Sequence, residues 1–170
     1  RRLSPRLEQL PNGEMIIPFT KFGIQTISVG FFLEEARSII WRGPMLHGLL
    51  QKLVEKVAWG NLDFLVVDLP PGTGDVLLSL SQLLPGGSAV VLSTPQEVAM
   101  VDCIKAINAF DQLDIPLLGL IENMAGFQVP GTEDIYHIFG QGKGQELALR
   151  FQTPLIGSIP LLPSIREGSD

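Results

Sequence analysis

An aspartate directly after an apolar run is the first candidate for chemistry. Asp68 follows residues 64–67, which read Phe-Leu-Val-Val, and it precedes a turn rich in proline and glycine that ends at Asp75. A carboxylate at the end of a buried strand is costly unless it is hydrogen-bonded, paired or near a cation. Asp68 is therefore a candidate ligand for a divalent cation. The alternative is an ordinary β–α turn in which Asp68 is hydrogen-bonded to the backbone.

The turn after Asp68 has the composition of an anion-binding loop. Pro70 and Pro71 stiffen the exit from the apolar run, and Gly72 and Gly74 let backbone N–H groups approach a ligand closely. Asp75 is placed as the N-cap of a following helix. The sequence thus predicts a concavity for an anion beside a possible cation ligand.

The elements that would position these residues alternate between strands and helices. Apolar residues at helical spacing predict helices over residues 44–58, 75–84, 96–112 and 142–150. Alternating or continuous apolar segments predict strands over residues 23–30, 64–67, 89–92, 117–121 and 155–159. Continuous apolar strands are typical of a sheet covered on both faces. The fold class predicted is therefore α/β, a mostly parallel sheet flanked by helices, with ligands at the carboxyl ends of its strands.

The composition narrows the class of protein. With 170 residues, 45% of them hydrophobic and 18% charged, the chain fits a single globular domain over residues 1–170. A net charge of −6 argues against a nucleic-acid partner. The sequence contains no uncharged apolar run of roughly eighteen residues, so we expect no membrane partner. The single cysteine, Cys103, excludes an internal disulfide and fits the cytoplasm or a reducing organelle matrix.

Residues 63–75 resemble the switch II segment of the Mrp/ApbC family of iron–sulfur cluster carrier proteins, which are deviant-Walker P-loop ATPases of the MinD/ParA class. Further stretches resemble segments of that family in the same order, namely residues 30–35, 40–45, 93–99, 121–124 and 157–160. The resemblance covers residues 13–168, nearly the whole chain. It implies a P-loop NTPase fold of the MinD (SIMIBI) type.

The resemblance also implies roles for individual residues. Asp68 would hold Mg²⁺ through water, and Gly72 would donate its N–H to the γ-phosphate, so these two are the candidate catalytic residues. Asn123 would hydrogen-bond the adenine and Pro160 would pack on the base; the alternative for Asn123 is a loop-capping role. The implied nucleotide-binding residues are Pro70, Pro71, Gly72, Thr73, Gly74, Asn123 and Pro160.

The family's phosphate loop, Gly-Lys-Gly-Gly-Val-Gly-Lys followed by Ser or Thr, does not occur in the 170 residues. Residues 140–144 are glycine-rich and include Lys143, but they follow no apolar strand. We therefore expect an N-terminally incomplete P-loop domain that lacks its first strand, its Walker A loop and its switch I region. On this expectation the complete protein hydrolyses ATP, and this chain alone is inactive.

The family's cluster-binding Cys-Pro-x-Cys is replaced as well. The two cysteine positions hold Val129 and Thr132, and neither side chain can replace a soft thiolate ligand. Cys103 lies among apolar residues of its predicted helix and is read as a buried structural cysteine. His47 and His137 are isolated. We therefore predict no iron–sulfur ligands of the usual kind.

Three functions are compatible with these features. The first is an ATP-hydrolysing, Mg²⁺-dependent carrier or assembly factor for iron–sulfur clusters, acting as a homodimer or related heterodimer on apo iron–sulfur proteins. The second is a regulatory ATPase of the MinD/ParA kind that holds no cluster, which the absent cysteines favour. The third is a non-catalytic binding or scaffold module in the form of this chain.

Overall fold

The computed structural model describes residues 6–11, 13–31, 43–69 and 74–168. Contacts divide the chain into two compact units, Arg1–Pro85 and Gly86–Asp170, which we describe separately. None of the helices in the described ranges is both long enough and apolar enough to cross a membrane.

The first unit begins with two antiparallel hairpins. Strand β1 (Arg6–Leu10) pairs with β2 (Gly13–Ile17), and β3 (Phe19–Lys21) pairs with β4 (Ile24–Thr26), followed by a short 3₁₀ helix η1 (Val29–Phe31). Phe22 and Gly23 connect β3 to β4 with φ angles of 55° and 76°, as a two-residue hairpin turn with right-handed strand twist requires. The strand predicted over residues 23–30 is confirmed only at Ile24–Thr26, because Gly23 belongs to this turn and η1 begins at Val29.

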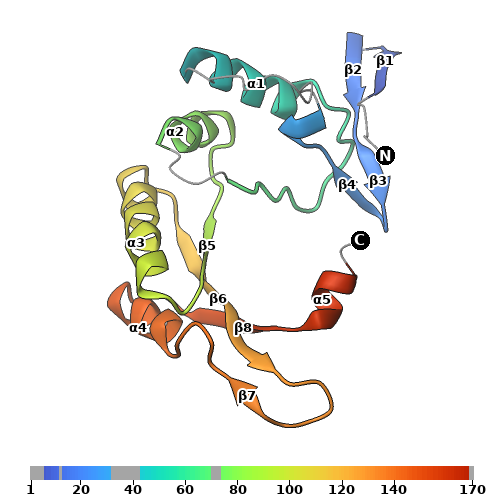
Figure 1. Cartoon of the computed structure of the whole chain (residues 1–170). Helices are drawn as coiled ribbons and strands as arrows, with labels where there is room; N and C mark the ends of the chain where they lie inside the picture. The colour runs from blue at the N-terminus through green and yellow to red at the C-terminus, as the bar shows by residue number, and fades with distance from the viewer. Residues whose placement is uncertain (1–5, 12, 32–42, 70–73, 169–170) are drawn as a thin grey trace. The chain divides into compact units, whose positions relative to one another are not determined.

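The described residues of the first unit also form the helices α1 (Gly43–Glu55) and α2 (Gly74–Leu83), which pack against each other (Figure 1). Both helix predictions are confirmed. Asp75 lies inside the first turn of α2 rather than at its N-cap, a position where a carboxylate still favours the helix dipole. Ile16 of β2 accepts and donates backbone hydrogen bonds of 2.8 and 2.7 Å to the chain just after α1, at Ala58 and Lys56.

The apolar run before Asp68 forms no strand. Residues 64–69 have no regular secondary structure, and Phe64 and Val66 are 87% and 90% exposed. The strand predicted over residues 64–67 is therefore wrong. A strand is stabilised by hydrogen bonds to a neighbouring strand, and no strand among the described residues pairs with this segment.

The second unit contains the parallel sheet that the sequence predicts. Strand β6 (Leu117–Gln128) lies between β5 (Ala89–Ser93) and β8 (Leu155–Leu161), and both neighbours are parallel to it (Figure 1). A short strand, β7 (Ile135–Tyr136), pairs antiparallel with the end of β6. The three predicted strands are confirmed, although β6 extends seven residues beyond the predicted end at 121.

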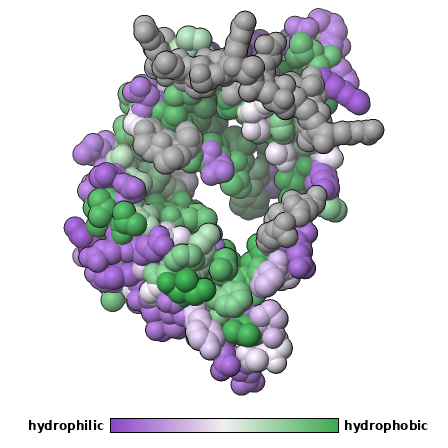
Figure 2. All heavy atoms as spheres, viewed as in Figure 1, coloured by the Kyte–Doolittle hydropathy of each residue, from purple (hydrophilic) through white to green (hydrophobic). Residues whose placement is uncertain are grey.

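Helices α3 (Glu97–Gln112) and α4 (Lys143–Arg150) cover one face of this sheet, and α5 (Pro163–Glu167) follows β8. Their inner sides form the core with alternate strand residues, and hydrophilic residues gather on their outer side (Figure 1, Figure 2). The buried members are Val91, Met100, Ile107, Phe110, Leu120 and Leu147. On the opposite face Val90, Leu92 and Ile156 are exposed, so the prediction of strands covered on both faces is wrong within the described part of this unit.

Helices α3 and α4 end in the same way. Asp114 and Gln152 adopt the left-handed conformation, with φ angles of 53° and 50°, just after the two helices. In each case the next N–H bonds back to the carbonyl five residues earlier, at 2.9 and 3.0 Å, as in the Schellman motif. A proline then follows, Pro116 or Pro154, and directs the chain into β6 or β8.

Candidate nucleotide site at the carboxyl ends of the strands

The strand register aligns the last residue of β5 with positions in β6 and β8, at the carboxyl edge of the part of the sheet that all three strands share. Ser93 of β5 pairs with Glu122 of β6, and Glu122 pairs with Ser158 of β8. Asn123 pairs with Ile159, so Pro160 is the next residue along β8. Two residues that the sequence assigns to base binding, Asn123 and Pro160, thus lie at the same edge on adjacent strands, where ligands of open α/β sheets bind.

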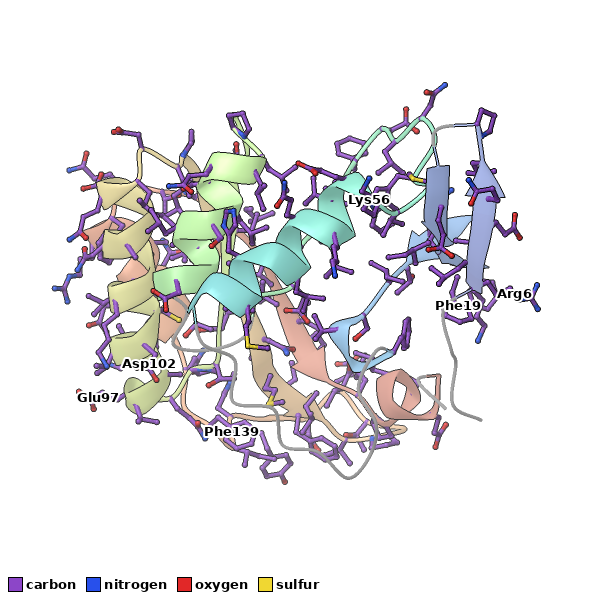
Figure 3. The ribbon with its side chains drawn as sticks, turned by 90° about the horizontal axis from the view of Figure 1, so that it is seen from above. Arg6, Phe19, Lys56, Glu97, Asp102 and Phe139 are labelled. Carbon is purple, nitrogen blue, oxygen red and sulfur yellow. The ribbon has the colours of Figure 1, made fainter. Side chains whose placement is uncertain are left out.

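A cavity of about 340 Å³ opens at this edge. Its volume is in the range of small-molecule sites, roughly 300–1,000 Å³. Its lining mixes apolar groups with hydroxyl, carboxylate and amide groups from β5, α3 and β6, namely Leu92, Ser93, Thr94, Ala99, Asp102, Cys103 and Asn123. Asp102 and Glu97 extend from the first half of α3 (Figure 3).

The side chain of Asn123 is partly engaged by its own backbone. Its Oδ1 accepts a hydrogen bond of 2.9 Å from the N–H of Met124, whose φ angle is 56°. The loop-capping role considered for Asn123 is therefore present. It does not exclude ligand binding, because an amide oxygen has a second lone pair and the amide nitrogen offers two donors.

Glu122 is a functional candidate that the sequence did not reveal. It is 7% exposed, and its Oε1 accepts a hydrogen bond of 2.7 Å from the N–H of Gly144 in the first turn of α4. A Cβ at Gly144 would lie 2.9 Å from both Cβ and Oε1 of Glu122, so only glycine fits beside this carboxylate. The available signal was a carboxylate directly before Asn123 together with a glycine at the start of a predicted helix.

The glycine-rich segment before α4 lies against the exits of β5 and β6. Gly140 has a φ angle of 96°, and a Cβ there would lie 3.1 Å from the carbonyl oxygen of Pro95. Lys143 donates a hydrogen bond of 2.8 Å to Glu146. That hydrogen bond and the negative charges of Glu146 and Glu97 raise the pKa of Lys143. The lysine of this segment is thus paired within its own helix, as a helix-surface residue rather than a phosphate-loop lysine.

Cys103 is buried, as the sequence predicts, and it also contributes to the wall of the cavity. Its exposed fraction is 8%, and its Sγ contacts the carbonyl oxygen of Leu92 at 3.6 Å. His137, which the sequence treats as isolated, has its Nδ1 3.1 Å from the carbonyl oxygen of Ala125. In the described ranges, no three His, Cys, Asp or Glu side chains are grouped so that they could hold a metal ion.

Asp68 and its turn belong to the first unit. Asp68 is exposed rather than at the end of a buried strand, because the run before it forms none. Pro70, Pro71, Gly72 and Thr73 lie outside the described residues, and Gly74 is the first residue of α2. Mg²⁺ is commonly held by one or two carboxylates together with waters and phosphate oxygens, so an accessible Asp68 is chemically suited to that ion.

Val129 and Thr132 lie in the turn that joins β6 to β7. Val129 donates its N–H to the carbonyl oxygen of Asp134 at 3.1 Å and accepts from the N–H of Thr132 at 3.2 Å. The hydroxyl of Thr132 donates to Val129 at 3.3 Å and accepts from the N–H of Asp134 at 3.2 Å. The two positions are thus close in space, and the turn is closed by hydrogen bonds that need no bound group.

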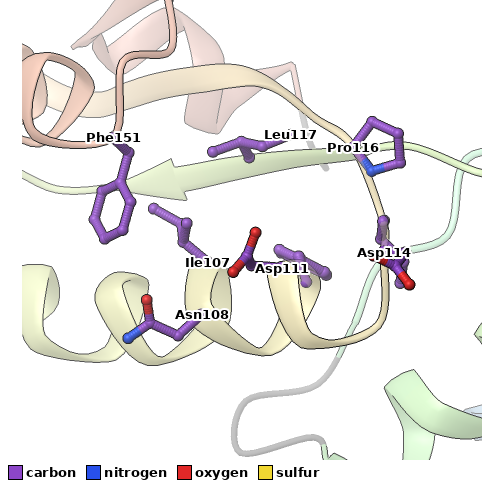
Figure 4. Close-up of a pocket in the computed structure, with 9 residues that line it drawn as sticks. Ile107, Asn108, Asp111, Asp114, Pro116, Leu117 and Phe151 are labelled. Atoms are coloured by element: carbon purple, nitrogen blue, oxygen red, sulfur yellow. The ribbon is translucent and has the colours of Figure 1, made fainter.

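A larger depression, of about 420 Å³, lies at the opposite end of β6 (Figure 4). Residues from the second half of α3, the start of β6 and the end of α4 line it, including Ile107, Asp111, Asp114, Leu117 and Phe151. Since it lies at the amino end of β6, it is not where an open α/β sheet binds nucleotide.

Comparison with known proteins is consistent with this geometry. A model of the ParA family, described as the NUBPL iron-transfer P-loop NTPase, matches residues 4–170. The iron-sulfur cluster carrier protein of Aquifex aeolicus is 49% identical over 158 residues, which are 92% of this chain and 43% of that protein. The mouse iron-sulfur cluster transfer protein NUBPL is 43% identical over 95% of this chain and 51% of its own length. The chain therefore spans about half the length of these relatives.

A solved structure has the same fold. The nucleotide-binding protein of Archaeoglobus fulgidus in complex with ADP is 33% identical, with a TM-score of 0.78 over 97% of this chain and 63% of that one. The chain thus has the α/β fold of a P-loop nucleotide-binding protein. Because the family model matches nearly all of the sequence, the chain belongs to the ParA-type family of NUBPL iron-transfer P-loop NTPases.

Proposed function

We propose that the chain is the base- and magnesium-binding part of an ATP-hydrolysing iron–sulfur cluster carrier. The observation that carries the proposal is the pairing of β6 with β8, in which Asn123 lines a cavity and Pro160 lies one residue beyond its partner on the neighbouring strand. The family match and the relatives named as cluster carriers support the same role. In this role Asn123 donates from its amide to the adenine, and Pro160 covers the base.

The remaining roles belong to the first unit and to a part of the protein beyond these 170 residues. Asp68 holds Mg²⁺ through water, and the N–H of Gly72 binds the terminal phosphate; Pro70, Pro71, Thr73 and Gly74 shape that turn. Mg²⁺ supplies charge neutralisation at the phosphates. We propose that the first strand, Walker A loop and switch I region are supplied outside residues 1–170, since the Gly-Lys-Gly-Gly-Val-Gly-Lys string is absent from them.

Two measurements test the nucleotide role. In the complete protein, Mg·ATP should raise the melting temperature, whereas the 170-residue chain should show no shift; a clear shift in the short chain would contradict the need for an added phosphate loop. Asp68→Asn in the complete protein should abolish Mg²⁺-dependent hydrolysis, while Asp63→Asn, at the other end of the same apolar run, should not. Equal turnover in both variants would remove Asp68 from this role.

A second candidate function is an ATP-driven dimer switch that carries no cluster. The turn at Val129 and Thr132 favours it, because it is closed by its own hydrogen bonds and lacks thiols. Anaerobic reconstitution of the complete protein, followed by iron and sulfide analysis, separates the two functions. Stoichiometric iron in the unaltered protein supports the carrier, and iron retained only by the Val129→Cys, Thr132→Cys double variant supports the switch.

We propose a homodimer or related heterodimer as the acting form, with apo iron–sulfur proteins as the partners of a carrier. Exposed Ile135, Tyr136 and Ile138 on and after β7 support a protein contact at this hairpin. The cytoplasm or an organelle matrix is the proposed location, in line with bacterial relatives and a plant relative named as mitochondrial. Sedimentation of the complete protein with and without Mg·ATP tests the dimer, and a monomer under both conditions would contradict it.

A further inference from the structure

We propose that Glu122 is a positioning residue for Asn123, acting through its hydrogen bond to the start of α4. The proposal rests on the proposed nucleotide role of Asn123 and extends it to a residue with no expected contact to the nucleotide. Glu122 lies one residue before Asn123 on β6; its carboxylate bonds to the N–H of Gly144, and it is not among the residues that line the cavity.

The carboxylate of Glu122 is buried and bonded to the start of α4. Glu122 is one of only three buried polar or charged residues in the described ranges, together with Ser79 and Ser93. A buried carboxylate is tolerated when it is hydrogen-bonded, and a helix amino terminus offers both free N–H groups and a favourable dipole. The 2.7 Å bond to Gly144 provides that compensation, so the position of Glu122 is fixed relative to α4.

The fixed position of Glu122 affects Asn123, the next residue along the chain. The backbone after Asn123 turns at Met124, which has a φ angle of 56°, a conformation that side chains other than Gly, Asn or Asp rarely adopt. The Oδ1 of Asn123 accepts the N–H of Met124 and holds this turn. Asn123 is thus held on both sides, by the Glu122 tether before it and by its own bond to Met124 after it.

The way in which Asn123 is held has a consequence for binding. The hydrogen bond from Met124 to Oδ1 fixes the orientation of the Asn123 amide group. The amide nitrogen is then the donor that remains for the base, and its orientation determines whether it can bond to an acceptor on the purine ring. Release of Glu122 from α4 lets β6 shift at its exit and misdirects that donor. A hydrogen bond to a base contributes about 0.5–1.5 kcal/mol, so loss of the tether should weaken Mg·ATP binding by about two- to thirteenfold.

A double-mutant cycle in the complete protein tests the proposal, with the dissociation constant of Mg·ATP as the readout. Glu122→Ala should weaken binding about as much as Asn123→Ala, and the double variant should be no weaker than Asn123→Ala alone. Glu122→Gln should restore most of the affinity, because its Oε1 can accept the same N–H. If the two losses add, Glu122 does not act through Asn123 and the proposal is wrong.

Gly144→Ala serves where Glu122→Ala does not fold, because a methyl group 2.9 Å from the carboxylate displaces it without removing it. It should weaken Mg·ATP binding to the same extent, whereas Gly157→Ala, whose Cβ would meet no atom within 4 Å, should not. Unchanged affinity in Gly144→Ala contradicts the tether. Failure of the unaltered complete protein to bind Mg·ATP would instead contradict the proposed function itself.

Discussion

Two apolar runs of the same length differ in structure: one forms a strand and the other has no regular secondary structure. Residues 64–67 read Phe-Leu-Val-Val and residues 89–92 read Ala-Val-Val-Leu, and a helix follows each run within about seven residues, α2 or α3. The second run is strand β5, with Val91 6% exposed, whereas Val66 in the first run is 90% exposed and in no strand. The difference lies in the neighbour: β5 pairs with β6, and no described strand pairs with the first run.

The comparison shows that an apolar run indicates which residues gain free energy from burial, but not which neighbouring strand will pair with them. A strand is stabilised only when its N–H and C=O groups are bonded and its side chains are covered. The environment of a functional residue therefore depends on whether the run that carries it is paired. Asn123 lies within the paired strand β6 and lines a defined cavity, while Asp68 follows a run that pairs with no described strand and is exposed.

The largest expected effect is the loss of unfolding free energy when a buried leucine, rather than an exposed one, is replaced by alanine. Leu120→Ala in β6 should lower the free energy of unfolding by about 2–5 kcal/mol, because Leu120 is 1% exposed and its removal leaves a cavity. Leu65→Ala in the unpaired run, where Leu65 is 41% exposed, should have a much smaller effect. Chemical denaturation of the 170-residue chain measures both, and equal losses would contradict the contrast.

A glycine pair probes the approach of β8 to β6. At Gly119 a Cβ would lie 2.6 Å from the side chain of Ile156 and 2.7 Å from the carbonyl oxygen of Pro154. Gly119→Ala should therefore destabilise the sheet by about 1–3 kcal/mol through overpacking. Gly157→Ala, on the paired strand but in open space, is the control. Similar melting temperatures for the two variants would show that the strands do not approach this closely.

Amide hydrogen exchange reports the pairing directly. The amide of Val91 lies in a three-stranded parallel ladder, so it should exchange only on opening of the sheet, whereas the amide of Val66 should exchange rapidly. The measurement needs no substitution and applies to the chain as it is. Strong protection at residues 64–67 would mean that this run has a partner after all.

The smallest effect concerns the end of α3. Asp114 has a φ angle of 53°, which glycine adopts more readily, so Asp114→Gly should raise stability by about 0.5 kcal/mol. Ala106→Gly, eight residues earlier and inside the helix, should lower it by about 0.5–1 kcal/mol. Thermal melts of the two variants should therefore shift in opposite directions, and a shift in the same direction would contradict the left-handed helix end.

The sequence predicted helices in both units, and it predicted the strands of the second unit better than those of the first. Helical spacing located α1 to α4 to within a few residues, and the paired strands β5, β6 and β8 were all predicted. The hairpins β1–β2 and β3–β4 and the short strand β7 were missed or misread, since these strands are short and lack a continuous four-residue apolar run such as that of β5. The run at 64–67 was misread because pairing is a tertiary property that no local pattern contains.

Some features of the candidate site were likewise predicted from the sequence, and others were missed. The positions of Asn123 and Pro160 at the carboxyl edge followed from strand order, and Cys103 was correctly placed in the core. Glu122 was missed, because the bond that gives it significance joins residues 22 positions apart in the chain. The roles assigned to Asp68 and Gly72 stay predictions.

A hydrogen-exchange footprint of Mg·ATP on the complete protein tests directly where the nucleotide binds. We expect slower exchange in peptides that contain residues 121–126 and 158–161, at the carboxyl edge beside Asn123 and Pro160. Slowing confined to residues 107–117, around the depression at the amino end of β6, would contradict it. So would Mg·ATP binding that leaves the exchange of both segments unchanged.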